Sequence, residues 1–153
     1  MTEPCAICTR VAAEPAIYEE ERWLLYPIEP PTPVLGWVYL CTRRHATSAA
    51  DFDALEAERF GAVLARVTQV LAELSRAPRI YTAALGEKVP HFHAHLVPRA
   101  EGAPRGFALF GEQARAAAAL GSDRAPSAQG LPTEAEARAF IERLRDALCR
   151  PPG

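Results

Sequence analysis

The most informative stretch of this chain is His91-Phe92-His93-Ala94-His95-Leu96-Val97-Pro98-Arg99. Histidines alternate with apolar residues, and alternate side chains of a β-strand point to opposite faces of a sheet. The pattern therefore predicts a strand over 91–97, with three imidazoles on one face about 6.5–7 Å apart and apolar residues toward the core. Imidazole near pH 7 suits attack on phosphorus, metal binding or acid–base chemistry. The residue type alone does not choose among these three.

Four further strands are predicted before residue 91. Runs of apolar, β-branched and aromatic residues, separated by turn signals, predict strands over 16–18, 22–26, 36–42 and 79–85. The first two form a hairpin. The third runs into a polar loop, so that His45 lies at the end of a strand.

Helical periodicity appears in two places. Asp53 and Glu56 form a capping box, and apolar residues then recur at helical spacing as far as residue 74. Thr133 and Glu136 form a second capping box before a helix that extends to residue 148. Runs of strands, rather than regular βαβ alternation, predict an α+β fold with five strands, one long helix and a C-terminal helix. A short alanine-rich helix is also predicted over 112–120.

The composition limits the class of protein. A chain of 153 residues can bury a core without disulfides, and 49% hydrophobic with 24% charged residues is typical of a globular domain. A net charge of -2 offers no excess of positive charge for a phosphate backbone, so long nucleic acids are not expected as partners. No apolar run is long enough to span a bilayer, and residues 1–4 lack the plan of a signal peptide. We therefore expect a cytoplasmic protein without a membrane partner.

Cys5 and Cys8 are separated by two residues, a spacing that lets both thiolates reach one tetrahedral zinc ion. The alternative is a pair of ordinary thiols, while a redox pair lacks a thioredoxin-like βαβ context. Two histidines would complete a metal site, and the available nitrogen donors are His45 and one member of the 91–95 row. These residues are far apart in sequence, so the fold has to bring them together.

At residues 91–99 the chain resembles the histidine triad (HIT) superfamily, whose signature is three histidines alternating with apolar residues, followed by two more apolar residues. The resemblance extends from Cys5 to about Arg99, because the cysteine pair, the strand leading to His45, the amphipathic helix and the motif strand follow in the family's order. It implies a five-stranded antiparallel sheet, usually in a homodimer. It also implies small-molecule nucleotide substrates, such as dinucleoside polyphosphates and nucleoside phosphoramidates.

The resemblance implies roles for individual residues. The middle histidine of the family attacks the α-phosphate, which here is His93, and water or another acceptor then removes the nucleotidyl group from the covalent intermediate. The last histidine, His95, would contact the phosphate and support the site. Zinc-bearing members imply a structural Zn²⁺ without an open coordination position. The corresponding ligands are Cys5, Cys8, His45 and His91.

Three positions of the expected substrate site depart from the family pattern. Glu87 stands where many members have glutamine. If its ionised side chain points into the site, it would repel an anionic leaving group and favour phosphoramidates, the alternative being a solvent-facing turn residue. Glu29 falls where an aspartate commonly holds the ribose hydroxyls, the alternative being a solvated loop acid. Ile7 replaces a phenylalanine at the base pocket, the alternative being a core residue.

We expect residues 1–106 to form the nucleotide-binding catalytic domain and residues 107–153 a C-terminal helical extension packed on it. The expected activity is nucleotide hydrolysis or nucleotidyl transfer. One alternative is a nucleotide-binding regulatory protein with little turnover, which Glu87 favours. Another is a metalloenzyme with two or three histidines of the row around a catalytic metal, which needs a further carboxylate or histidine at a compatible spacing.

Overall fold

The fold is a five-stranded antiparallel sheet with helices on both faces. The computed structural model describes residues 4–28, 32, 34–111 and 131–151. The strands are β1 (Tyr18–Glu19), β2 (Trp23–Pro27), β3 (Val38–Thr42), β4 (Arg79–Ala83) and β5 (His93–Arg99). The helices are α1 (Ala6–Ala13), α2 (Ala54–Ser75) and α4 (Glu134–Cys149), with a short 3₁₀ helix at Ala49–Asp51. The strand order β1-β2-β3-β5-β4, with every pair antiparallel, confirms the expected α+β architecture.

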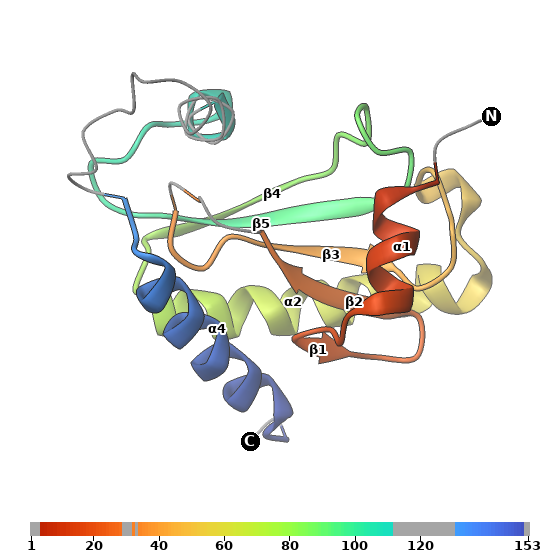
Figure 1. Ribbon diagram of the computed structural model, residues 1–153, viewed down its shortest axis with the longest axis horizontal. Helices are drawn as coiled ribbons and strands as arrows, with labels where there is room; N and C mark the ends of the chain where they lie inside the picture. Colours follow the sequence, from red (N-terminus) through yellow and green to blue (C-terminus); the bar gives the residue numbers. More distant parts are fainter. Residues whose placement is uncertain (1–3, 29–31, 33, 112–130, 152–153) are drawn as a thin grey trace.

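The main core lies between one face of the sheet and the helices α2 and α4, which run below the sheet in Figure 1. The buried side chains of each helix recur at a spacing of four residues, so that they form one apolar stripe. These are Val63, Val67 and Leu71 of α2, and Phe140, Leu144 and Leu148 of α4. The strands meet them with Trp23, Leu25, Val38, Leu40, Ala94 and Leu96. Burial of each large side chain contributes about 1.5–3 kcal/mol.

The helix α1 covers the opposite face of the sheet. Its Ile7 is buried against side chains of β2 and β3 that alternate with those of the main core, namely Leu24, Tyr26, Tyr39 and Cys41. This helix was not predicted from the sequence. It has only eight residues, and its N-cap Cys5 makes no side-chain capping hydrogen bond, so the usual start signal is missing.

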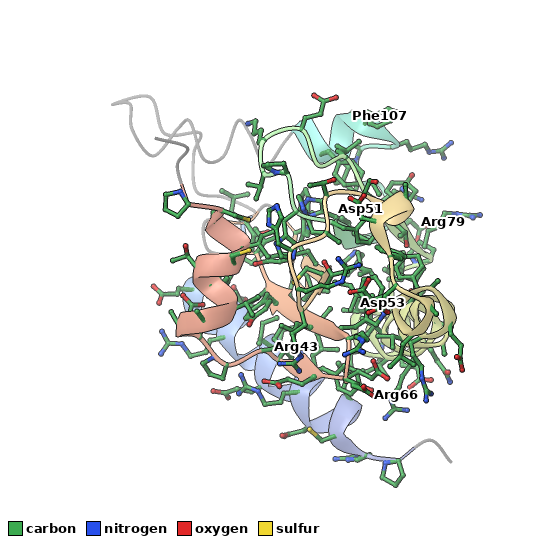
Figure 2. The ribbon with its side chains drawn as sticks, turned by 90° about the vertical axis from the view of Figure 1, so that its right-hand side faces the viewer. Arg43, Asp51, Asp53, Arg66, Arg79 and Phe107 are labelled. Carbon is green, nitrogen blue, oxygen red and sulfur yellow. The ribbon has the colours of Figure 1, made fainter. Side chains whose placement is uncertain are left out.

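The start of α2 confirms the first capping box. The Asp53 carboxylate accepts from the Glu56 amide at 2.8 Å, and the Glu56 carboxylate accepts from the Asp53 amide at 2.7 Å. Glu56 is fully buried, and Arg44 donates to it at 2.6 Å. Asp51 and Asp53 are labelled at this connection in Figure 2. The Arg44–Glu56 pair therefore ties the loop that carries His45 to the start of α2.

The helix α4 begins at the second predicted capping box, where Thr133 and Glu136 exchange hydrogen bonds. Its Phe140 lies against the turn that leads into β3. Gly36 in this turn has a φ of 81°, and a Cβ placed there would lie 2.6 Å from Cε1 of Phe140. Both the backbone conformation and the close approach therefore require glycine.

The motif strand differs from its prediction, because β5 runs from His93 to Arg99 rather than over 91–97. The amide of His91 donates to Val89 O at 2.8 Å, and the amide of Phe92 donates to Ala46 O at 2.6 Å. Both amides bond to loop carbonyls, so β5 begins two residues later than predicted. The prediction that three imidazoles share one face of the strand is therefore wrong for His91, whose ring lies beside Cys5 and Cys8 instead. The helix predicted over 112–120 lies outside the described residues. No described helix is long and apolar enough to cross a membrane.

Candidate functional site

Four donor atoms from three separate segments meet beside the first turn of α1. The Sγ atom of Cys8 lies 3.3 Å from Nδ1 of His45 and 3.4 Å from Nδ1 of His91. The Sγ atom of Cys5 lies 3.6 Å from the same nitrogen of His91. All four atoms lie within 4.8 Å of one another. The structure thus brings together the residues that the family resemblance had suggested as metal ligands.

The donor set fits a tetrahedral zinc ion. Zinc–sulfur bonds of about 2.3 Å and zinc–nitrogen bonds of about 2.0–2.1 Å place sulfur and nitrogen about 3.5 Å apart, close to the separations seen here. The Nε2 atom of His91 lies 2.8 Å from Thr42 O, and a carbonyl only accepts, so the proton is on Nε2 and the Nδ1 lone pair faces the cysteines. Burial and then the Cys5 thiol raise the pKa of Cys8. A divalent cation would offset that effect and stabilise the thiolates.

His93 is held in one tautomer by the backbone. Its Nδ1 lies 2.7 Å from the carbonyl oxygen of His91, so Nδ1 carries the proton and donates it to that oxygen. In the neutral form of the ring, this hydrogen bond leaves the lone pair on Nε2, the atom that a nucleophile would use. The sequence did not identify this hydrogen-bond acceptor.

His95 lies next to His93 on the same face of β5, with ring centroids 5.0 Å apart. Trp37, just before β3, donates from Nε1 to Nδ1 of His95 at 3.1 Å. Burial and then the neighbouring His93 lower the pKa of His95 to about 4, so the ring is neutral at pH 7. Of the three motif histidines, His93 and His95 thus form the row, and His91 faces the cysteines.

Tyr39 forms the wall between this row and α1. Its ring lies edge-on to His93 at 6.0 Å and to His95 at 6.3 Å between centroids. Arg10 donates to the Tyr39 hydroxyl at 3.2 Å and packs its guanidinium over the same ring. Burial is the main cause that raises the pKa of Tyr39 to about 12, so the phenol is protonated at pH 7. Sequence reasoning missed Trp37, Tyr39 and Arg10.

The three residues expected to bind substrate are placed very differently. Ile7 is a buried core residue that also lines a cavity of about 320 Å³ together with Arg10 and Tyr39. Glu87 is exposed in the connection between β4 and β5, and no contact between it and the histidines is seen among the described residues. Glu29 lies outside the described residues.

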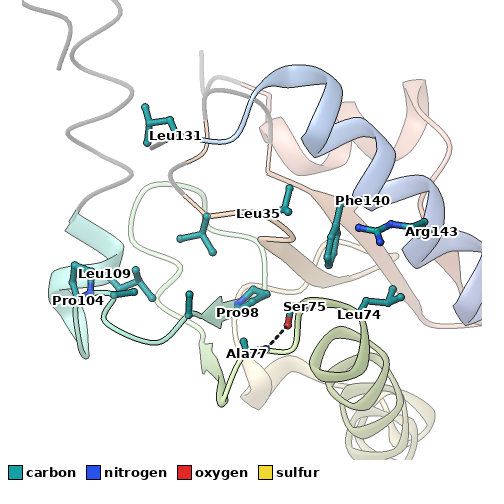
Figure 3. Close-up of a pocket in the computed structure, with 13 residues that line it drawn as sticks. Leu35, Leu74, Ser75, Ala77, Pro98, Pro104, Leu109, Leu131, Phe140 and Arg143 are labelled. Carbon is teal, nitrogen blue, oxygen red and sulfur yellow. Dashed lines mark hydrogen bonds between the residues drawn. The ribbon is translucent and has the colours of Figure 1, made fainter. Parts of the chain in front are cut away.

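A larger cavity of about 450 Å³ lies beyond the far end of β5, between α4 and the segment that follows the strand (Figure 3). Its walls are mainly apolar and include Leu74, Pro98, Leu109 and Phe140, with Arg143 among the lining residues. None of the four histidines lines it, so the cavity is separate from the chemistry described above.

Comparison with known families gives an independent result. The family model described as the HIT domain matches residues 10–102, which is more than half of the chain. A comparison with curated proteins found no significant match.

Similar solved structures have the same fold over most of their length. A Hit-like protein from Bartonella henselae, involved in cell-cycle regulation, has a TM-score of 0.67 at 13% identity, covering 96% of this chain and 98% of its own. A zinc-bound histidine triad family protein from Mycobacterium smegmatis has a TM-score of 0.61 at 22% identity, with coverages of 94% and 92%. Diadenosine triphosphate hydrolase from Plasmodium falciparum has a TM-score of 0.52 at 17% identity, with coverages of 65% and 70%. These likenesses show the fold, and together with the family match they establish that the chain belongs to the HIT domain family.

Proposed function

We propose that this protein is a nucleotide hydrolase or nucleotidyl transferase in which His93 attacks the α-phosphate of a dinucleoside polyphosphate or a nucleoside phosphoramidate. His95 contacts the phosphate. Membership of the HIT domain family supports the general class of reaction. The hydrogen bond from His93 Nδ1 to the carbonyl of His91 carries the proposal, because it selects the tautomer with the lone pair on Nε2 and orients the ring beside a second imidazole.

The proposed reaction is a double displacement. A bond forms between His93 Nε2 and phosphorus while the bond from phosphorus to the leaving group breaks, and the leaving group takes the electron pair. Water or another acceptor then forms a new oxygen–phosphorus bond while the nitrogen–phosphorus bond breaks. The electron pair of the broken bond returns to His93 Nε2, and the proton of the attacking hydroxyl group passes to solvent. During both steps the Nδ1 proton stays on the hydrogen bond to His91 O. Splitting one difficult displacement into two easier steps lowers the barrier.

Cys5, Cys8, His45 and His91 would hold a zinc ion at this site. With four protein ligands the ion would have no open position and would serve as a structural brace. The cluster contains one motif histidine, whereas the catalytic-metal alternative requires two or three of them around one ion. His93 and His95 are thus left for the nucleotide.

We place the nucleoside against the cavity lined by Ile7, Arg10 and Tyr39. This cavity adjoins the histidine row, because Tyr39 contacts both His93 and His95. Glu29 and Glu87 stay proposals for contacts with the ribose and the leaving group. The free thiols that the metal centre needs fit a reducing compartment, so we propose a cytoplasmic location.

The decisive experiment replaces the proposed nucleophile. His93→Ala should lower the turnover of diadenosine triphosphate and adenosine 5′-phosphoramidate by at least about 10³-fold, because the covalent route is lost. Zinc content and thermal unfolding should match the wild type, since His93 is not among the four donors. Wild-type protein quenched during turnover should carry an adenylyl group on His93 in tryptic mass spectra.

Chemical rescue of activity by added imidazole provides a matched control. His93→Gly should regain part of its activity with added imidazole, whereas His93→Ala should regain less because its methyl group occupies part of the vacated space. Near-normal turnover by His93→Ala would rule out the proposed mechanism.

A further inference from the structure

Trp37 holds His95 in a way that the nucleophilic mechanism does not itself require. The indole is almost fully buried, and its Nε1 lies 3.1 Å from Nδ1 of His95. The two rings meet edge to face at 85°, with centroids 5.9 Å apart. Tyr39, two residues along the same segment, and Phe110, which follows β5 in the chain, also lie edge-on to this imidazole, with centroids 6.3 and 6.4 Å away.

This contact fixes the position of the proton on His95. An indole N–H only donates, so Nδ1 of His95 has to offer its lone pair. The single proton of the neutral imidazole is therefore on Nε2. A second proton on Nδ1 would place two N–H groups against each other in a buried contact, where an unmade hydrogen bond is costly. The lowered pKa of His95 points in the same direction.

A histidine in this state donates a hydrogen bond but does not supply a proton. Loss of the Nε2 proton would leave an imidazolate, because the indole of Trp37 has no proton to give to Nδ1 near pH 7. On the basis of the proposed function, we propose that Trp37 is a positioning residue that keeps His95 a neutral hydrogen-bond donor, so that the site takes nucleotides whose leaving group departs as an anion.

The leaving group decides which substrates fit such a site. When His93 Nε2 bonds to phosphorus, the bond to the bridging oxygen of a polyphosphate breaks, and that oxygen keeps the electron pair as a phosphate anion. No proton is needed. An amine that leaves from a phosphoramidate would depart as an amide anion unless it took a proton from solvent. Tyr39 is no substitute acid, since its pKa is raised to about 12. The site should therefore favour dinucleoside polyphosphates over phosphoramidates.

The test begins with the ring nitrogens of the zinc-loaded, ligand-free protein. At pH 7, ¹⁵N spectra of wild type should show Nε2 of His95 protonated and Nδ1 unprotonated. Trp37→Phe keeps an aromatic ring but removes the donor, so the proton should distribute over both nitrogens. A proton on Nδ1 in wild type, a doubly protonated ring, or an unchanged spectrum in Trp37→Phe would overturn the assignment.

The chain offers a matched control in its other tryptophan. Trp23 is fully buried in the main core against Phe52, Phe60 and Phe92, and its Nε1 has no hydrogen-bond partner among the described residues. Trp23→Phe makes the same chemical change on the opposite face of the sheet. It should leave the His95 spectrum as in wild type, and an equal shift in both variants would mean that Trp37 has no specific role.

Kinetics then test the leaving group. For wild type, kcat/KM for adenosine 5′-phosphoramidate should lie on the order of 100-fold below that for diadenosine triphosphate, the low end of what acid catalysis provides. Trp37→Phe should narrow this ratio, because His95 is free to take up and release a proton. An equal rate or a preference for the phosphoramidate would contradict the inference. Inactivity of wild type on both substrates with the spectra as expected would refute the proposed function and leave the role of Trp37 in fixing the tautomer supported.

Discussion

His91 serves both parts of the site with different atoms. Its ring Nδ1 faces the two cysteines, and its backbone carbonyl accepts the hydrogen bond that orients His93. Because the ring and the carbonyl belong to one residue, a shift of the His91 backbone would disturb both contacts. On the proposed mechanism, a structural metal therefore affects turnover without touching the substrate, because it helps to hold the nucleophile in its attacking tautomer.

The four clustered donors should bind zinc tightly. Wild type purified without added metal should contain one zinc per chain. Cys8→Ser should lower both the zinc content and the midpoint of thermal unfolding, because binding of a structural metal contributes to the free energy of folding. Elemental analysis and calorimetry of the same samples measure both quantities.

Cys149→Ser provides the control for that experiment. Cys149 is exposed at the end of α4 and is not among the four clustered donors, so its replacement should change neither quantity. A wild type that is metal-free and equally stable would contradict the zinc assignment.

The turn before β3 gives a prediction at the scale of elements. Gly36→Ala should lower the free energy of unfolding by about 1–3 kcal/mol, because alanine tolerates the positive φ poorly and its Cβ would collide with Phe140. Gly61→Ala is the matched control. Gly61 lies within α2 with open space around it, and alanine there should stabilise the protein by about 0.5–1 kcal/mol. Urea unfolding of both variants measures the difference, and equal shifts would show that Gly36 is not constrained.

Sequence patterns predicted the long helices better than the strand ends. The start of α2 and that of α4 were found because capping boxes and four-residue periodicity act within one helix. The helix α1 was missed because it is short and lacks a side-chain cap. The start of β5 was misplaced because the amides of His91 and Phe92 bond to loop carbonyls, which no local pattern reveals.

The walls of the site were missed for a related reason. Trp37 and Tyr39 alternate on one segment, so a shared face was predictable. Their contact with His95 depends on the register between β3 and β5, which pairs Tyr39 with His95. Register is set by tertiary packing rather than by the sequence of one strand. The four metal donors, by contrast, were suggested through the family resemblance, and the structure brings them together.

For the whole molecule, we propose that the C-terminal extension is part of a single folding unit. Removal of α4 by ending the chain at residue 132 would take Phe140, Leu144 and Leu148 out of the main core, which they share with the buried side chains of α2. Loss of the three large buried side chains of α4 should cost about 5 kcal/mol or more, comparable with the whole stability of many domains. Circular dichroism should show an unfolded or aggregated product. A chain ending at Arg150 should melt like the full chain, and a stable 1–132 product would contradict the proposal.

The free edge of the sheet is a candidate surface for association between two copies of the chain. The strand β4 is at the end of the sheet, and its outer edge has no strand partner within the described part of the chain. Open edges offer backbone hydrogen bonds to a second copy, and Leu85, just after β4, is 57% exposed. We expect a homodimer that pairs along β4, with Leu85→Asp weakening it. Sedimentation should give twice the mass of one chain for wild type, and a monomer at micromolar concentration would refute the expectation.

The spread of the four donors along the chain has a consequence for synthesis on the ribosome. Cys8 precedes His45 by 37 residues and His91 by 83. At a translation rate of about 5–20 residues per second, the ribosome adds His91 roughly 4–17 s after Cys8. During this interval both thiols lack their last partner and are open to oxidants and to competing metals in the cell. On the proposed mechanism, the last donor to be translated also carries the carbonyl that orients His93, so a newborn chain would complete its metal site and orient its nucleophile only once His91 has been added.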